Sequence, residues 1–165
     1  MDLSHLESIE RDNQNFDTPE ALEHDLLINH LETLLSGKSV NIPEYDFSTH
    51  TRLSRSKRIS HNTRIVLVEG LFALYWEKLR QLLSTKIFID IDSDICLARR
   101  IKRDVIERAR SREIIKRQFR QTVLPMYDST VAPTCEYADL VLRGDAPIHE
   151  SVDRVLAFIS NEELT

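Results

Sequence analysis

Hydrophobic residues recur at helical spacing in the first third of the chain. Thr18 and Pro19 are typical of an N-cap and a first helical turn, and leucines then recur every three or four residues until Gly37. This pattern predicts one helix that begins after Thr18 and ends at Gly37. Two extended pieces follow at 40–47 and 57–60, with basic, polar sequence between them. They predict a projecting β-hairpin.

The rest of the chain alternates between short apolar runs and helical patterns. Because the apolar runs are continuous, we expect strands that are buried on both faces of a parallel sheet, as in α/β folds. Strands are predicted at 65–68, 86–90 and 138–142. Helices are predicted at 75–83, from Asp92 or Ser93 to about 107, from Ser111 to about 124, and at 147–160. No repeat or linker interrupts this order, so one domain over residues 1–165 is expected.

Composition limits the class of protein. The chain has 165 residues, of which 41% are hydrophobic and 30% charged, with three glycines and two cysteines. These values exclude collagen-like and disulfide-framework proteins, and two isolated thiols fit a reducing compartment, so a cytoplasmic location is expected. The longest apolar run falls well short of the roughly 20 residues that cross a bilayer, so we expect no membrane span and no signal peptide.

The net charge of −5 hides two segments of opposite sign. Residues 1–33 carry nine acidic side chains and one basic one, whereas residues 99–120 carry ten basic side chains, eight of them arginines, and three acidic ones. Arginine binds phosphate and carboxylate groups through two parallel hydrogen bonds, which favours a polyanionic ligand at 99–120. The alternative is a solvated helix face that pairs with the acidic first third of the chain.

No segment has the spacing of a phosphate-binding glycine loop. Residues 36–39 (Ser-Gly-Lys-Ser) imitate the end of G-x-x-x-x-G-K-[ST], but Glu32 stands where the first glycine belongs. The preceding residues also belong to an amphipathic helix rather than to a strand. We therefore interpret 36–39 as a helix C-cap.

Five motifs occur in a set order. They are Asn-Phe-Asp-Thr-Pro at 15–19, Pro-Glu-Tyr-Asp-Phe-Ser-Thr-His-Thr-Arg at 43–52, Val-Leu-Val-Glu-Gly at 66–70, the arginine-rich run at 99–110, and Tyr-Ala-Asp at 137–139. Together, over nearly the whole chain, they resemble the uridine/cytidine kinase family of P-loop nucleoside kinases, which is related to phosphoribulokinase. The resemblance implies an α/β fold with a P-loop-kinase-like parallel sheet, flanking helices, a projecting hairpin and an arginine-rich helical lid.

The resemblance also implies an activity, the transfer of the γ-phosphoryl group of ATP, with Mg²⁺, to the 5′-hydroxyl of a pyrimidine nucleoside in pyrimidine salvage. In that family a P-loop strand, its helix and a strand leading to the catalytic aspartate precede the motif at 15–19. These first strands have no counterpart in the 165 residues, which suggests a truncated chain or a misassigned start. Because transfer needs the phosphate cradle and a base, we expect this chain alone to be inactive.

Individual site residues follow from matching positions in the family. Asp17 resembles the carboxylate that accepts hydrogen bonds from both ribose hydroxyls, with a helix-start residue as the alternative. Glu69, expected at the end of a buried strand, resembles the acid that holds Mg²⁺ or its waters. The resemblance implies that Tyr45 and His50 recognise the edge of the pyrimidine base and that Phe16 and Phe47 are the aromatic side chains that enclose it. It implies further nucleoside contacts by Arg100 and Gln118. Neutralisation of the transferring phosphates is implied for Arg103, Arg108 and Arg110.

Two other functions stay open. One is a non-catalytic protein that binds a pyrimidine nucleoside and associates with a complete kinase subunit or with its own copies. The other is nucleic-acid binding through residues 99–120, although the overall acidity and the lack of interleaved aromatic side chains argue against it.

Overall fold

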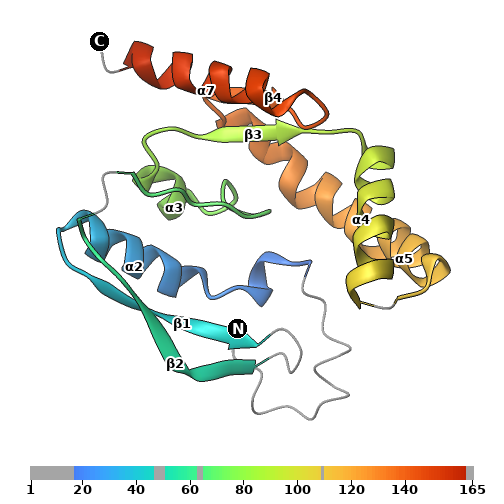
Figure 1. Ribbon diagram of the computed structural model, residues 1–165, viewed down its shortest axis with the longest axis horizontal. Coiled ribbons are helices and arrows are strands. Elements are labelled where there is room, and N and C mark those ends of the chain that lie inside the picture. Colours follow the sequence, from blue (N-terminus) through green and yellow to red (C-terminus); the bar gives the residue numbers. More distant parts are fainter. Residues whose placement is uncertain (1–16, 47–50, 63–64, 109, 163–165) are drawn as a thin grey trace. The chain divides into compact units, whose positions relative to one another are not determined.

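The computed structural model describes residues 17–46, 51–62, 65–108 and 110–162 (Figure 1). The chain divides into two compact units, Met1–Leu82 and Leu83–Thr165. The structure is mixed α/β, with small sheets and flanking helices, which confirms the predicted fold class. That all 165 residues form one domain stays a prediction.

The first unit begins with two helical elements rather than one. A 3-10 turn, η1 (Pro19–Ala21), is followed by a bend and then by the helix α2 (His24–Leu35). Thr18 precedes η1 as expected, but its side chain makes no capping hydrogen bond. The prediction of a single helix from 18 to 37 is therefore wrong for its first turn, because the extended conformation at Leu22 interrupts the helical backbone.

Gly37 ends α2 in a Schellman motif. Its φ is 79°, a conformation that glycine adopts without steric cost. The Lys38 N–H donates to the Thr33 carbonyl at 3.1 Å, and the Gly37 N–H donates to the Leu34 carbonyl at 3.0 Å. The interpretation of residues 36–39 as a C-cap is confirmed.

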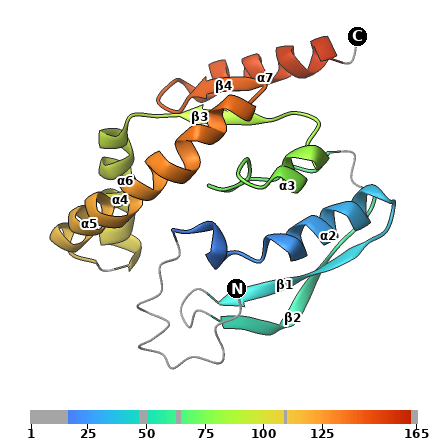
Figure 2. The same ribbon diagram turned by 180° about the vertical axis from the view of Figure 1, so that it is seen from behind.

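β1 (Val40–Asp46) and β2 (Thr51–Ile59) form the expected antiparallel hairpin. Val40 pairs with Ile59 at one end, and Asp46 pairs with Thr51 at the other. β1 runs beside α2 (Figure 2). The second strand is longer than the predicted 57–60, because the polar side chains at 54–58 are exposed and an exposed strand can pair without an apolar pattern.

A small apolar core holds α2 against α3 (Glu77–Leu82). Ile28 and Leu31, three residues apart on one face of α2, are 4% and 7% exposed, and Leu79 of α3 is completely buried. Val68, Trp76 and Leu82 pack around these three side chains. The helix predicted at 75–83 is confirmed, with slightly shorter bounds.

Residues 65–69 do not form the predicted buried strand. Ile65 and Leu67 are 80% and 85% exposed, and the segment pairs with no strand among the described residues. A continuous apolar run is buried only where neighbouring strands pair with its backbone and other elements cover its faces. Here Val68 alone packs against the α2–α3 core. The prediction of a buried strand leading to Glu69 is wrong.

The second unit is built on a parallel sheet, as predicted, but among the described residues the sheet has two strands rather than three. β3 (Ile87–Asp90) pairs with β4 (Leu140–Arg143), with Phe88 opposite Val141. The helix α7 (Ile148–Glu162) follows β4 and contacts it. Within the described part of the chain, no helix combines the length and apolar character that a bilayer span requires.

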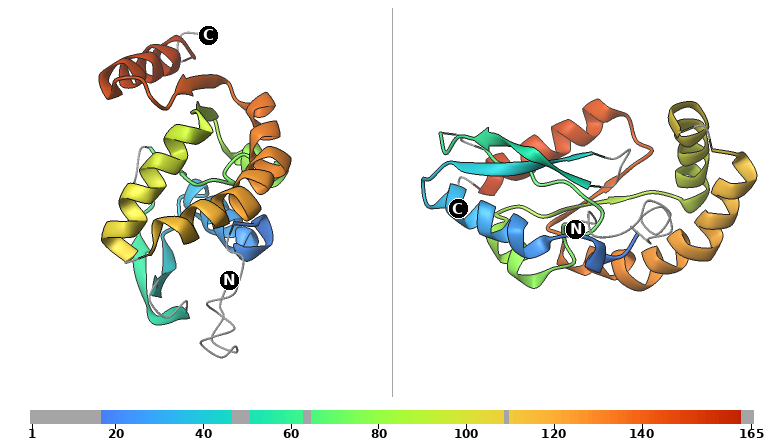
Figure 3. Two further views of the ribbon diagram at one scale, coloured as in Figure 1. Left: turned by 90° about the vertical axis from the view of Figure 1, so that its right-hand side faces the viewer. Right: turned by 90° about the horizontal axis from the view of Figure 1, so that it is seen from below.

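Two capped helices, α4 (Ser93–Arg108) and α5 (Arg112–Gln118), meet at one end of this unit (Figure 3). Asp92 accepts the Asp94 N–H at 3.0 Å, and the Ser111 hydroxyl accepts the Ile114 N–H at 3.3 Å. Both residues act as the predicted N-caps.

The helix predicted to end near residue 124 continues to residue 137. Pro125 has no N–H to donate, and π-helical turns on both sides of it carry the helical run past the proline. After α5 the run consists of η2 (Phe119–Val123), α6 (Leu124–Met126), η3 (Tyr127–Val131) and η4 (Ala132–Tyr137).

Candidate functional site

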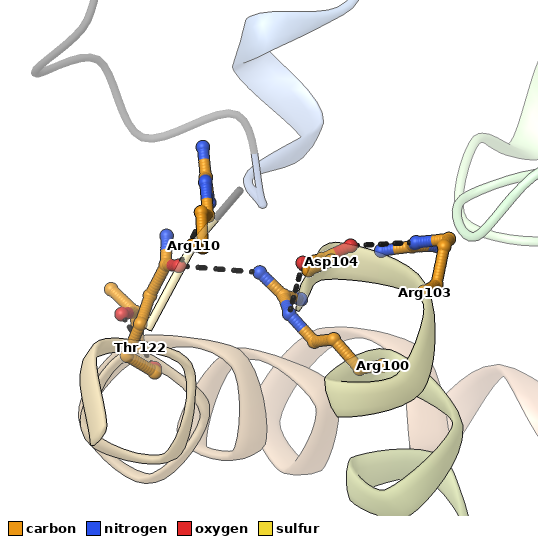
Figure 4. A network of polar contacts seen from close by, with 6 residues as sticks. Arg100, Arg103, Asp104, Arg110 and Thr122 are labelled. Carbon is orange, nitrogen blue, oxygen red and sulfur yellow. Dashed lines mark hydrogen bonds and ion pairs between the residues drawn. The ribbon is translucent and has the colours of Figure 1, made fainter. Parts of the chain in front are cut away.

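Five polar side chains of the second unit converge where α4 and α5 meet (Figure 4). At their centre the Asp104 side chain is completely buried. Arg103 Nε donates to Asp104 Oδ1 at 2.7 Å. Arg100 Nε lies 3.6 Å from Asp104 Oδ2, which is an ion pair too long for a hydrogen bond. We call these five residues the arginine cluster: Arg100, Arg103, Asp104, Arg110 and Gln118.

Gln118 joins the two helices from the other side of the cluster. Its Oε1 accepts from Arg100 Nη2 and from Arg110 Nη1, each at 3.4 Å. The Arg110 backbone N–H donates to the Asp104 carbonyl at 3.2 Å. The Gln118 carbonyl in turn accepts from the Thr122 hydroxyl at 2.9 Å. The structure therefore brings together four of the predicted site residues, three of them arginines.

The arginine cluster carries an excess of positive charge, because it contains three guanidinium groups and one carboxylate. The hydrogen bond to Asp104 is the main cause of a raised pKa at Arg103, so this side chain stays protonated. Arg100 is 17% exposed and Arg103 47% exposed. Partly buried guanidinium groups with excess charge are suited to an oxyanion ligand such as a phosphate group.

Asp104 is the residue that sequence reasoning missed. In the sequence it counts only as one of three acids that partly offset the basic run at 99–120. A signal was present, because Asp104 lies four residues after Arg100 and seven after Leu97, where the apolar face of the helix continues. An acid at such a position indicates a buried, paired carboxylate.

Of the predicted nucleoside contacts, Asp17 and Tyr45 are described in the first unit. Asp17 lies just before η1 and Tyr45 lies in β1 opposite Arg52, and both side chains are half-buried. Phe16, Phe47 and His50 lie outside the described residues. The roles assigned to all five stay predictions.

Two further predicted residues, Glu69 and Arg108, stay predictions. Glu69 is exposed and lies in the irregular segment 65–69. No group of three or more His, Cys, Asp or Glu side chains that could hold a metal ion occurs in the described part of the chain. Arg108 is the last residue of α4, and its side chain lies outside the described residues.

A pocket of about 370 Å³ opens in the first unit at the start of α2. Glu23 and Arg52 form an ion pair at its wall, and the His24 ring stacks on Trp76 with ring centroids 5.0 Å apart. Neither Asp17 nor Tyr45 lines this pocket. Its lining consists of Leu22, Glu23, His24, Asp25, Leu26 and Arg52.

The Tyr-Ala-Asp motif at 137–139 has a structural role at the beginning of the parallel sheet. Asp139 Oδ2 accepts from the Lys86 backbone N–H at 2.7 Å and lies 2.9 Å from Lys86 Nζ. The Asp139 N–H donates back to the Lys86 carbonyl at 2.8 Å. Burial alone would raise the pKa of Asp139, but the hydrogen bonds and charge of Lys86 together lower it. We call this pair the Lys86–Asp139 clamp.

Known proteins match most of this chain. The sequence pattern of the family described as "Phosphoribulokinase / Uridine kinase family" matches residues 1–146. A protein named "Uridine kinase" from Chloroflexus aurantiacus is 42% identical over 158 residues, which cover 96% of this chain and 75% of that protein. A protein of the same name from Vibrio parahaemolyticus is 40% identical over 159 residues, with 96% and 74% of the two chains covered.

Proposed function

Because the chain belongs to the phosphoribulokinase and uridine kinase family, we propose that it serves the ATP-dependent phosphorylation of a pyrimidine nucleoside at its 5′-hydroxyl. The observation that supports this proposal is the arginine cluster, in which a buried carboxylate and a glutamine hold three guanidinium groups. Such a group of cations stabilises the charge that develops on transferring phosphate oxygens. We further propose that the protein acts in the cytoplasm, in pyrimidine salvage.

The arginines divide between two tasks in this proposal. Arg103, Arg108 and Arg110 neutralise the phosphate groups, and Arg103 is the most accessible of the cluster arginines that ion-pair with Asp104. Arg100 and Gln118 lie deeper and are linked to each other, which suits a fixed surface against the nucleoside. Fixed donors lose little conformational freedom when the ligand binds.

The other nucleoside contacts are assigned to residues of the first unit. Asp17 binds the ribose, because one carboxylate can accept from the two hydroxyls of a cis-diol. Tyr45 and His50 read the pyrimidine edge, and Phe16 and Phe47 enclose the ring. These assignments rest on the family motifs at 15–19 and 43–52.

ATP would supply the phosphoryl group, and the arginine cluster has the charge to bind its phosphates. The described residues offer no comparable set of ligands for Mg²⁺, and we therefore derive no step through a metal ion. The 165 residues also contain no G-x-x-x-x-G-K-[ST] loop. We expect this polypeptide alone to bind a nucleoside without phosphorylating it. Association with a complete kinase subunit is the second candidate function.

The test is a titration of uridine, deoxyuridine and adenosine followed by ligand-observed NMR. Wild-type protein should bind uridine with a dissociation constant of about 1 mM, since a few hydrogen bonds must offset the ordering of the site. Asp17→Ala should remove the preference for ribose over deoxyribose, and His50→Ala should weaken pyrimidine binding. Glu32→Ala removes an exposed acid of α2 and should change neither.

Equal responses to the three nucleosides in every variant would refute the proposed nucleoside site. Incubation with ATP, Mg²⁺ and uridine should yield no uridine monophosphate above background. Steady ATP-dependent product formation that is abolished by Asp17→Ala would contradict the expected inactivity of this polypeptide.

A further inference from the structure

Asp104 is the only fully buried charged side chain in the described part of the chain. Burial of a carboxylate is costly unless cations and hydrogen-bond donors compensate for the lost water. Arg100 and Arg103 of the same helix provide this compensation. The buried carboxylate therefore holds two side chains of the arginine cluster from the interior of the unit.

Asp104 faces both arginines through their Nε atoms. The Nε atoms of Arg103 and Arg100 lie 2.7 Å and 3.6 Å from its two carboxylate oxygens. The terminal amino groups of the guanidinium groups remain as donors for other acceptors, and Arg100 already directs one of them to Gln118. Asp104 therefore orients these side chains without occupying the atoms that would bind an oxyanion end-on.

The backbone of Asp104 places the third arginine. Its carbonyl accepts the N–H of Arg110, six residues further along the chain, at 3.2 Å. This bond holds Arg110 next to the end of α4, where Gln118 accepts from its guanidinium group. One residue thus contacts Arg100 and Arg103 through its side chain and Arg110 through its main chain.

We propose that Asp104 is a positioning residue that strengthens the binding of phosphate groups by holding Arg103 and Arg110 in place, and that its contact with Arg100 keeps the neighbouring side chain ordered. This inference rests on the proposed function, because it takes phosphate as the ligand of the arginine cluster. It predicts that removal of the Asp104 charge weakens phosphate binding, whereas simple electrostatics predicts that this removal strengthens it. A negative charge near an anion site repels the anion, whereas a positioning residue removes the entropic cost of ordering arginine side chains.

Asp104→Asn is the informative substitution, because it keeps the volume of the side chain. Asparagine offers one acceptor oxygen and one amino group, so it must turn a donor toward one of the two Nε–H groups. At least one arginine then loses its orientation. Ordering one or two such side chains on binding corresponds to an affinity loss of about tenfold.

The matched control is Glu107→Gln, which removes an exposed acid from the same helix. The charge of Glu107 also acts on Arg103, but no hydrogen bond between these two side chains is recorded among the described residues. Calorimetric titration with inorganic tripolyphosphate should show unchanged or tighter binding for Glu107→Gln and about tenfold weaker binding for Asp104→Asn. Unchanged or tighter binding by folded Asp104→Asn would overturn the proposal.

A second measurement covers the case in which Asp104→Asn does not fold, as judged by circular dichroism. In wild-type protein, NMR should show slower exchange of the Arg103 Nε proton with water than of the Nε proton of exposed Arg117, and tripolyphosphate should shift the Arg103 signal. Equal exchange rates, or no shift, would refute the positioning role.

The uridine titration separates the two proposals. Loss of uridine binding, with the tripolyphosphate results as expected, would refute the nucleoside kinase function and leave Asp104 as the positioning residue of an anion site. Selective uridine binding with tighter tripolyphosphate binding by Asp104→Asn would refute only the positioning role.

Discussion

The Lys86–Asp139 clamp makes the stability of the second unit depend on one carboxylate at the beginning of its sheet. Asp139→Ala removes the acceptor of the Lys86 N–H and the partner of Lys86 Nζ, which lie 2.7 Å and 2.9 Å from Asp139 Oδ2. A hydrogen bond to a charged acceptor contributes about 1.5–3 kcal/mol. The Asp139 side chain is 31% exposed, so water replaces part of the lost interaction. We expect the free energy of unfolding to fall by about 1–2 kcal/mol.

The same clamp predicts a pH dependence. The interactions with Lys86 lower the pKa of folded Asp139 below its ordinary value of 3.8, against the effect of burial, which raises it. The stabilisation is therefore complete above the unfolded pKa and is lost as the pH falls through the lower, folded pKa. The penalty of Asp139→Ala should be present at pH 7 and shrink below about pH 4.

Urea denaturation followed by circular dichroism measures both effects. Asp153→Ala, which removes an exposed acid from α7, is the control for the change in net charge. Asp139→Asn keeps one acceptor and should cost less than about 1 kcal/mol. Equal stability of Asp139→Ala and Asp153→Ala at pH 7, or a difference between them that stays constant down to pH 3, would refute this account of the clamp.

Two further substitutions test packing. Leu79→Ala should lower the free energy of unfolding by about 2–5 kcal/mol, because Leu79 is fully buried. Leu71→Ala, at a position 52% exposed, should have little effect. A small loss of stability for Leu79→Ala in urea denaturation would show that the α2–α3 contact contributes little. A Cβ at Gly144 would lie 3.0 Å from Ile89 Cγ2 and 3.0 Å from Ile91 Cβ, so Gly144→Ala should cost about 1 kcal/mol. A thermal midpoint at or above the wild-type value would contradict that estimate.

The motifs of the sequence identify the family, and local chemistry determines much of the secondary structure. Ser111 and Asp92 cap α5 and α4 through hydrogen bonds to residues only two or three positions away. Gly37 ends α2 because a left-handed conformation favours glycine wherever the chain goes next. These features depend on neighbours in the chain, and the sequence is sufficient to predict them.

The candidate site could be predicted only in part. The residues of the basic run at 99–120 were recognisable, but in the sequence Asp104 is only one of three acids among ten bases. Asp104 is completely buried at the place where α4 and α5 meet and where Gln118 accepts from Arg100 and Arg110. Helix packing, rather than spacing along the chain, turns a charged run into an organised cluster.

The sequence alone determined the presence of most helices, of the hairpin and of the apolar runs, because propensity, periodicity and capping act over a few residues, although the first helix is interrupted and the helix after Ser111 runs on to residue 137. Only the tertiary structure decided which apolar runs became strands. Residues 87–90 and 65–69 have similar composition, yet the first segment pairs with β4, whose residues lie 53 positions further along the chain, and the second is left exposed. A strand is stable when a partner satisfies its backbone hydrogen bonds and covers its side chains. That partner comes from a distant part of the chain, and no local pattern specifies it.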